Sequence, residues 1–203
     1  MKKILYILAA LYVFTSTPSK AADIIEITVS PGYTMPIWVN PGSPPEENIG
    51  GLSFTVRSYF GSLFFDEYDI EYGVEAGYFP LYSWDYTETF MGSQERYRSR
   101  YSVIPVIGQA RFRFGLPTDD SFPYFVTGIG FFHWRRSYEY PESLPGAGII
   151  RTSGTETRTT LGFTGGVGYW AQLSHNLHGD LMLRWTSSYS AINFHFGLGM
   201  MFF

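Results

Sequence analysis

The sequence has no cysteine at any of its 203 positions, which excludes disulfides, thiolate metal sites and a lipidated cysteine. Its three lysines, Lys2, Lys3 and Lys20, all lie within the first 20 residues. Without residues 1–22, the chain carries 11 arginines against 18 acidic residues, a formal net charge of −7. Because binding to nucleic acid phosphates requires a basic surface, this balance argues against a nucleic acid as partner.

Long hydrophobic runs are also missing after the N-terminal segment, so no helix of about 20 apolar residues is available to cross a bilayer. Only 16% of the residues are charged, compared with about a quarter in ordinary soluble domains. Aromatic residues, by contrast, make up 19% of the chain, and glycine occurs 22 times. Little charge, many aromatic side chains and short apolar runs together indicate strands that are apolar on one face.

The N-terminal segment has the three parts of a secretory signal peptide. Lys2 and Lys3 form a basic region, residues 4–14 form an apolar core, and residues 15–22 are mostly small or polar. The apolar core is too short for a helix that remains in a membrane. We therefore predict a signal peptide at residues 1–22, cleaved after Ala21 or Ala22, and one domain at residues 23–203.

Segments in which apolar and polar residues alternate follow one another along residues 23–203, a pattern typical of barrel strands. In the third of them, Ile70 and Val74 alternate with Asp69 and Glu75. The fifth segment is ambiguous, because both of its sets of alternate residues are largely apolar. The eight predicted strands are 24–33, 50–60, 68–82, 100–114, 123–135, 158–173, 179–185 and 191–203.

The predicted connections alternate in length. Connections 34–49, 83–99 and 136–157 are long and polar or turn-rich, whereas 61–67, 115–122 and 174–178 are shorter. With a periplasmic N-terminus, the long connections face outward and the short ones inward, which is the asymmetry of outer-membrane barrels. The sequence therefore predicts an all-β fold, an eight-stranded antiparallel up-and-down transmembrane β-barrel. A secreted lipocalin-like barrel is the alternative.

Motifs of glycine and aromatic residues recur in the predicted strands at residues 73–79, 123–131 and 165–169, the last followed by the polar turn 174–178. With the aromatic C-terminus, they resemble the OmpX/opacity-type family of small outer-membrane β-barrels over residues 23–203. The resemblance implies a Gram-negative outer-membrane protein, with outer-membrane lipids, lipopolysaccharide and the outer-membrane assembly machinery as partners. We expect a monomer. The C-terminal assembly signal would comprise Phe202 and Phe203, although the apolar alternation ends on Phe202.

An eight-stranded barrel is just wide enough for side chains to fill its interior. Buried charges persist there only in pairs, because an unpaired one costs several kcal/mol. We therefore predict a structural charge network in the lumen, which His133 and Arg135 could join. Its members, taken from the faces expected to point inward, are Glu26, Arg57, Asp69, Glu71, Glu75, Arg111, Arg113, Arg158, Asp180, Arg184 and His195.

With a filled lumen, the protein would have a structural role or bind an unknown surface ligand through its extracellular loops. A small pore and a lipid A-modifying acyl hydrolase or transferase are the alternatives. The lipid A deacylase motif His-x-Ser-Asn is missing, since residues 184–187 read Arg-Trp-Thr-Ser, and His175 and His178 fall in a predicted periplasmic turn. No His-Glu-x-x-His or acidic calcium loop occurs. The sequence thus predicts no catalytic, cofactor-binding or metal-binding residue.

Overall fold

The computed structural model describes residues 25–37, 48–65, 68–90, 93–115, 119–144, 148–188 and 191–202. The predicted signal peptide lies outside these residues. Within the described part of the chain, no helix is long and apolar enough to cross a membrane. The strands are β1 (Ile25–Pro36), β2 (Asn48–Ile49), β3 (Gly51–Phe65), β4 (Tyr68–Phe90), β5 (Ser93–Arg113), β6 (Ser121–Leu144), β7 (Gly148–Gln172), β8 (Leu177–Thr186) and β9 (Ala191–Phe202).

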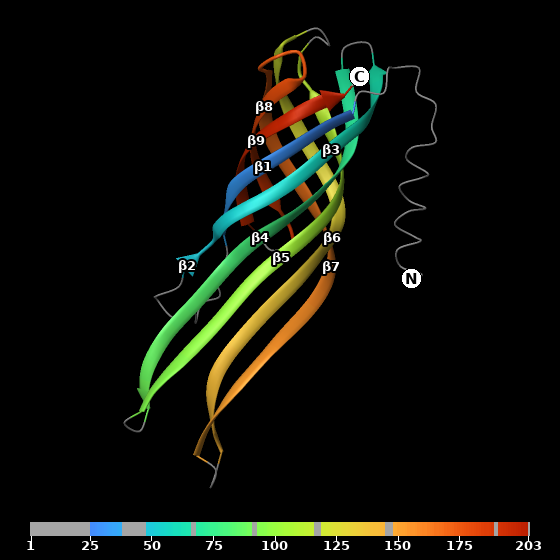
Figure 1. The fold of residues 1–203 in the computed structure, drawn as a ribbon. Helices are drawn as coiled ribbons and strands as arrows, with labels where there is room; N and C mark the ends of the chain where they lie inside the picture. Colours follow the sequence, from blue (N-terminus) through green and yellow to red (C-terminus); the bar gives the residue numbers. More distant parts are fainter. Residues whose placement is uncertain are drawn as a thin grey trace.

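Eight of these strands form one closed ring of antiparallel pairs (Figure 1). Each strand pairs with its neighbour in the sequence, and β1 closes the ring by pairing with β9, from Ile25 opposite Phe202 to Pro36 opposite Ala191. The two-residue β2 pairs only with β4 and directly precedes β3, so it is not a separate member of the ring. The predicted eight-stranded up-and-down barrel is confirmed.

Gly50 separates β2 from β3 and has a φ of 82°, in the left-handed region that favours glycine. Its backbone N–H donates to the carbonyl oxygen of Leu81 at 2.7 Å. A Cβ at this position would also overlap the backbone oxygen of Thr34. Glycine therefore allows the chain to turn here while remaining bonded to β4.

Side chains alternate between the outside of the ring and its lumen. In β1, Ile27 and Val29 are exposed on the outer face, whereas Thr28 and Ser30 are buried inside. In β8 as well, Leu181 and Leu183 face outward and Asp180 and Arg184 face inward. Parts of β4, β5 and β6 differ, because apolar residues such as Phe79, Val103 and Val126 are buried inside the ring. An apolar outer face and a polar inner face are the arrangement expected of a barrel in lipid.

The ambiguous facing of the fifth predicted strand is resolved in β6. Tyr124 and Val126 point into the lumen and are buried, and Phe125 is exposed on the outer face. His133 and Arg135 have the parity of Phe125 and are exposed as well. The suggestion that these two residues join the lumen network is therefore wrong.

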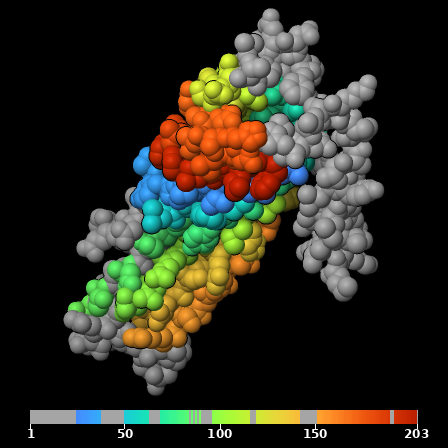
Figure 2. All heavy atoms as spheres, turned by 45° about the horizontal axis from the view of Figure 1, so that its top comes forward, coloured from blue at the N-terminus to red at the C-terminus, as the bar shows by residue number. Residues whose placement is uncertain are grey.

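Two of the predicted outer loops are wrong, because residues 83–99 and 136–157 lie mainly in strands. β4 and β5 stay paired as far as Phe90 opposite Ser93, and β6 and β7 as far as Leu144 opposite Gly148. β5 and β6 pair with each other up to Arg98 opposite Glu139, so the two hairpins form one four-stranded sheet. This sheet, which we call the extension, projects well beyond β1, β8 and β9 (Figures 1 and 2).

Proline and turn-forming residues had suggested loops in this region. Pro141 in fact lies in β6 opposite Arg151 of β7, beyond the last residue at which β6 pairs with β5. There β6 is an edge strand, where the missing N–H of proline breaks no ladder hydrogen bond. The alternating tyrosines and threonines of the hairpins are good strand formers and favour the longer pairing.

Candidate functional site: a charged lumen below an aromatic mouth

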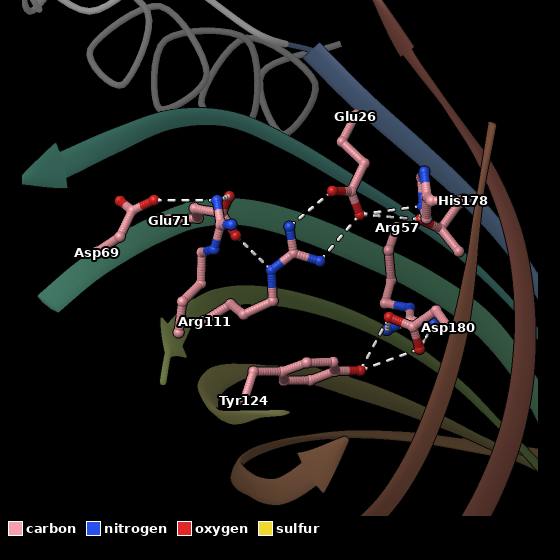
Figure 3. Close-up of polar contacts among 10 residues, drawn as sticks. Glu26, Arg57, Asp69, Glu71, Arg111, Tyr124, His178 and Asp180 are labelled. Carbon is pink, nitrogen blue, oxygen red and sulfur yellow. Dashed lines mark hydrogen bonds and ion pairs between the residues drawn. The ribbon is translucent and has the colours of Figure 1, made fainter. Parts of the chain in front are cut away.

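Arg111 is the centre of a charged cluster in the lumen (Figure 3). This cluster lies at the end of the ring where β1 begins and β9 ends, which we call the inner end, and the extension lies at the other, outer end. Its two terminal nitrogens donate to the two carboxylate oxygens of Glu26, at 2.9 and 2.6 Å, and its Nε donates to Glu71. The ring of Tyr59 lies 4.0 Å from the guanidinium carbon and covers one face of the cation. Such a bidentate, fully desolvated pair sets both the position and the orientation of the guanidinium.

Arg113 extends this cluster toward the inner end. Its Nη1 lies 3.3 Å from a carboxylate oxygen of Asp69 and 3.5 Å from one of Glu71. The guanidinium carbon lies 3.8 Å from the centre of the Phe122 ring. Glu71 therefore contacts two arginines that follow one another on the inner face of β5.

His178 belongs to the same cluster, and its predicted place in a periplasmic turn is wrong. It is the second residue of β8 and is fully buried, with Nε2 3.3 Å from Glu26 Oε1 and 2.9 Å from Thr28 Oγ1. Its ring also stacks on Trp170, with 5.2 Å between the centroids. The alternation from His178 through Asp180 continues along β8 and could have revealed the longer strand.

A second group lies deeper in the lumen, around Asp180. Arg57 Nη2 donates to Asp180 Oδ1 at 3.1 Å and to Ser30 Oγ at 2.6 Å. The hydroxyl of Tyr124 donates to the same carboxylate, 2.9 Å from Oδ2. Sequence reasoning missed Tyr124, because its strand was apolar on both faces.

A third pair joins β4 to β8. Arg184 Nη1 lies 2.5 Å from Glu75 Oε1, and both side chains are fully buried. The ring of Phe79 lies 5.5 Å from the guanidinium carbon of Arg184 and packs edge-on against His195. All three groups lie inside the ring, so charged and aromatic side chains occupy the lumen over most of its length.

Arg158 is not brought together with the other predicted lumen residues. It pairs in β7 with Trp134 of β6, above the ring, and its side chain is exposed. Its position in the strand alternation places it on the face that continues the lumen wall, as predicted. It lies above the ring, however, and not inside the lumen. The ten remaining predicted residues are five carboxylates, four arginines and His195, which is fully buried. His178 is a further partner of Glu26.

The C-terminal strand was expected to end in an assembly signal. Phe202 pairs with Ile25 at the closing seam and is 48% exposed on the outer face. Phe203 lies outside the described residues. The structure thus agrees with the apolar alternation that ends on Phe202.

An apolar layer lies inside the ring at its outer end. Phe79, Leu81, Val103, Ile107, Phe132 and Ala191 form this layer, and Tyr82, Tyr101 and Trp134 pack on it. Tyr82 and Tyr101 are stacked, with centroids 4.3 Å apart. Above the layer lies a cavity of about 680 Å³, whose wall includes Tyr101, Trp134, Arg136, Glu156, Arg158 and Ser188.

The extension carries its own ion pairs. Arg96 donates to both carboxylate oxygens of Asp85, at 2.6 Å each, and Arg98 donates to Oδ2 at 3.2 Å. These hydrogen bonds, that from Arg96 above all, lower the pKa of Asp85 from its ordinary 3.8 to about 2. Among the described residues no group of histidine and carboxylate side chains could hold a metal ion.

Comparison with solved structures shows which known proteins share this fold. The sequence matches no known protein family and no curated protein. The structure is similar to Ail, the attachment invasion locus protein of Yersinia pestis, with a TM-score of 0.51, 14% identity and coverage of 88% of this chain and 99% of that one.

Two further solved structures have the same fold. The outer membrane protein OprG from Pseudomonas aeruginosa has a TM-score of 0.52 and 10% identity, with 89% and 96% of the two chains covered. A major outer membrane protein from Thermus thermophilus has a TM-score of 0.52 and 11% identity, with 88% and 99% covered. The fold is therefore that of small outer-membrane β-barrel proteins, as the resemblance to the OmpX type implied.

Proposed function

We propose that this protein is a monomeric outer-membrane barrel with a closed lumen, and that it binds ligands at the cell surface through its extension. The proposal is carried by the filling of the lumen. Four groups of side chains follow one another from the inner to the outer end of the lumen. They are the cluster around Arg111, the cluster around Asp180, the pair of Arg184 with Glu75, and the apolar layer that includes Phe132. Ions would meet desolvated, paired charges and then an apolar layer, which argues against a pore.

The outer surface of the ring supports residence in lipid. Large apolar side chains such as Phe163, Leu183 and Phe196 are exposed on it, which in water would be an unusually large apolar surface. Outer-membrane lipids and lipopolysaccharide would cover this surface after export by a cleaved signal peptide. Insertion by the assembly machinery would use the C-terminal strand with Phe202.

The extension supports a binding role. Four hydrogen-bonded strands hold its side chains in place, so a ligand would not have to order a flexible loop on binding. Ail, which has the same fold, has been crystallised in complex with the heparin analogue sucrose octasulfate. That complex concerns Ail alone, and the case for this chain depends on the side chains of its own extension.

An acyl hydrolase or transferase is less consistent with the geometry. His178 and His195 are fully buried in the lumen, away from the outer-leaflet lipid that such an enzyme would use. His133 contacts Thr159 on the exposed face, at 3.1 Å. A nucleophile needs an oriented base within hydrogen-bond reach, and none of these contacts supplies a serine beside a histidine.

Single-channel recording in planar bilayers tests the closed lumen. The folded wild-type protein should give no stepwise conductance. The triple variant Glu75→Ala, Arg184→Ala and Phe132→Ala should stay closed as well, because the Arg57–Asp180 and Arg111–Glu26 pairs remain in the lumen. Stepwise conductance through the wild-type protein would show that the lumen is a pore and would overturn the proposal.

A further inference from the structure

The cavity above the apolar layer is lined by both aromatic and charged side chains. Tyr101 of β5 and Trp134 of β6 contribute aromatic rings at its base, where both pack on the apolar layer. Trp134 Nε1 donates to Thr160 Oγ1 at 3.0 Å, which fixes the orientation of the indole. Fixed aromatic rings beside polar groups are a common wall for organic ligands.

Two arginines lie in the same wall. Arg136 is positioned over the ring of Tyr101, at 5.3 Å, and lies 3.6 Å from Glu156. Arg158, on the neighbouring strand, forms no ion pair with any described residue. With Glu156 as the one acidic residue in the cavity wall that the structure describes, the wall has a formal charge of +1.

Polar atoms without partners also line the cavity. Ser188 Oγ and Arg136 Nε form no hydrogen bond with the described residues. Ser188 lies in the turn after β8 and packs directly over Gly162, where a Cβ would overlap its hydroxyl. A buried polar group normally has a partner, so these atoms are available to a ligand that carries hydroxyl groups or an anion.

The aromatic surface continues outward from this cavity. A second hollow of about 220 Å³ shares Arg136 with the first and is lined further by Tyr97, Tyr138 and Tyr140. Tyr138 and Tyr140 are stacked, with centroids 5.5 Å apart, and Arg136 also lies over Tyr138, at 5.5 Å. The two hollows thus form one row in which tyrosines alternate with a shared arginine.

This row lies on the face of the extension that continues the lumen wall. Trp134 and Arg136 have the parity of Phe132, which is buried in the lumen, whereas Phe131 and Arg135 face outward. Lipid around the barrel would contact the outward face. The side chains of the row are therefore open to the external side of the membrane.

We propose that this row binds an external anionic saccharide, with one or two sugar units in the larger cavity. Sugar rings present C–H faces that pack on tyrosine and tryptophan, and a sulfate or carboxylate would pair with Arg158 and Arg136. The cavity of about 680 Å³ lies within the usual size range for small-ligand sites. The inference names the ligand class for the surface role proposed above and rests on that proposal.

Isothermal titration of the folded, nanodisc-embedded protein tests this inference with two probes, a sulfated chondroitin disaccharide and the neutral disaccharide lactose. We expect saturable binding of the sulfated probe, at least about tenfold tighter than that of lactose, and weakening of the binding with added salt. No saturable binding of the sulfated probe, or equal affinity for lactose, would overturn the inference.

Two arginines on β7 provide a matched pair of variants. Arg158→Gln should weaken binding of the sulfated probe about tenfold, because it removes a charge from the cavity wall. Arg151→Gln removes the same charge from the other face of the same strand, where Arg151 lies 3.8 Å from Glu139, and should leave the affinity unchanged. Equal weakening by both variants would indicate diffuse attraction and would contradict a specific site.

Tyr101→Leu separates ring packing from charge, and it should weaken the binding of both probes. An unaltered affinity for both would contradict the packing of sugars on this ring. These results are distinguishable from a failure of the proposed function. If the protein conducts ions, the lumen is not closed, and the proposed function fails whatever the protein binds. If the lumen is closed but the sulfated probe does not bind, only the saccharide site is contradicted.

Discussion

Arg57 Nη2 lies 3.1 Å from Asp180 Oδ1, although the two residues are 123 positions apart in the sequence. Arg57 is in β3 and Asp180 in β8, and both side chains are inaccessible to solvent. The pair crosses the lumen, so its geometry depends on the closure of the whole ring. Substitutions in this pair therefore test the packing of the lumen directly.

Asp180→Leu should destabilise the folded barrel by about 3–5 kcal/mol, because it leaves the Arg57 guanidinium buried without its carboxylate. Urea titration of the lipid-embedded protein, followed by the mobility shift between folded and unfolded forms on a gel, measures the change. The double variant Arg57→Met, Asp180→Leu should recover most of the loss. Wild-type stability in the single variant would contradict the pairing.

Arg111 and Arg158 test which arginines belong to the lumen. Arg111→Met should cost several kcal/mol, since Glu26 and Glu71 would lose their shared cation. Arg158→Met should change the free energy of unfolding by less than about 0.5 kcal/mol, because its side chain is exposed. The same urea titration applies to both, and similar losses would return Arg158 to the lumen network.

Cysteine labelling tests the orientation of the barrel, and the absence of native cysteines makes it simple. Thr155→Cys, exposed in β7 of the extension, should react with a membrane-impermeant maleimide on intact cells. Ser174→Cys, exposed between β7 and β8 at the opposite end, should react only after the outer membrane is permeabilised. Labelling of Ser174→Cys on intact cells, with Thr155→Cys protected, would mean that the orientation is reversed.

Asp85 should make the β4–β5 hairpin sensitive to acid. Its pKa is lowered to about 2 by Arg96, so its stabilising contribution is fully present above its ordinary pKa of 3.8 and is lost as the pH falls toward 2. Hydrogen exchange of residues 82–99 should be slower in the wild type than in Asp85→Asn at pH 5, and the two should converge near pH 2. A difference that persists at pH 2 would argue against the ion pair as its source.

Much of the fold could be predicted from the sequence because strand alternation is a local property. Side chains point to opposite faces at every second residue, so Ile27 and Glu26 reveal their sides without knowledge of any partner strand. The strand count, and the inward faces of all predicted strands except the fifth, followed from the same period. The lengths of β4 to β7 did not, because Pro141 and the charged residues near it resemble a loop until the neighbouring strand is known.

The sequence by itself determined that this chain forms a barrel with an apolar exterior and a charged interior. The tertiary structure decided which charges meet, since partners such as Arg57 and Asp180 depend on the register of every strand between them. The tertiary structure also shows that His178 lies in the lumen and that Arg158 lies above the lumen. The cavity at Tyr101 and Trp134 could arise only from the extension, because it needs three strands and the β8–β9 turn to meet at the mouth of the ring.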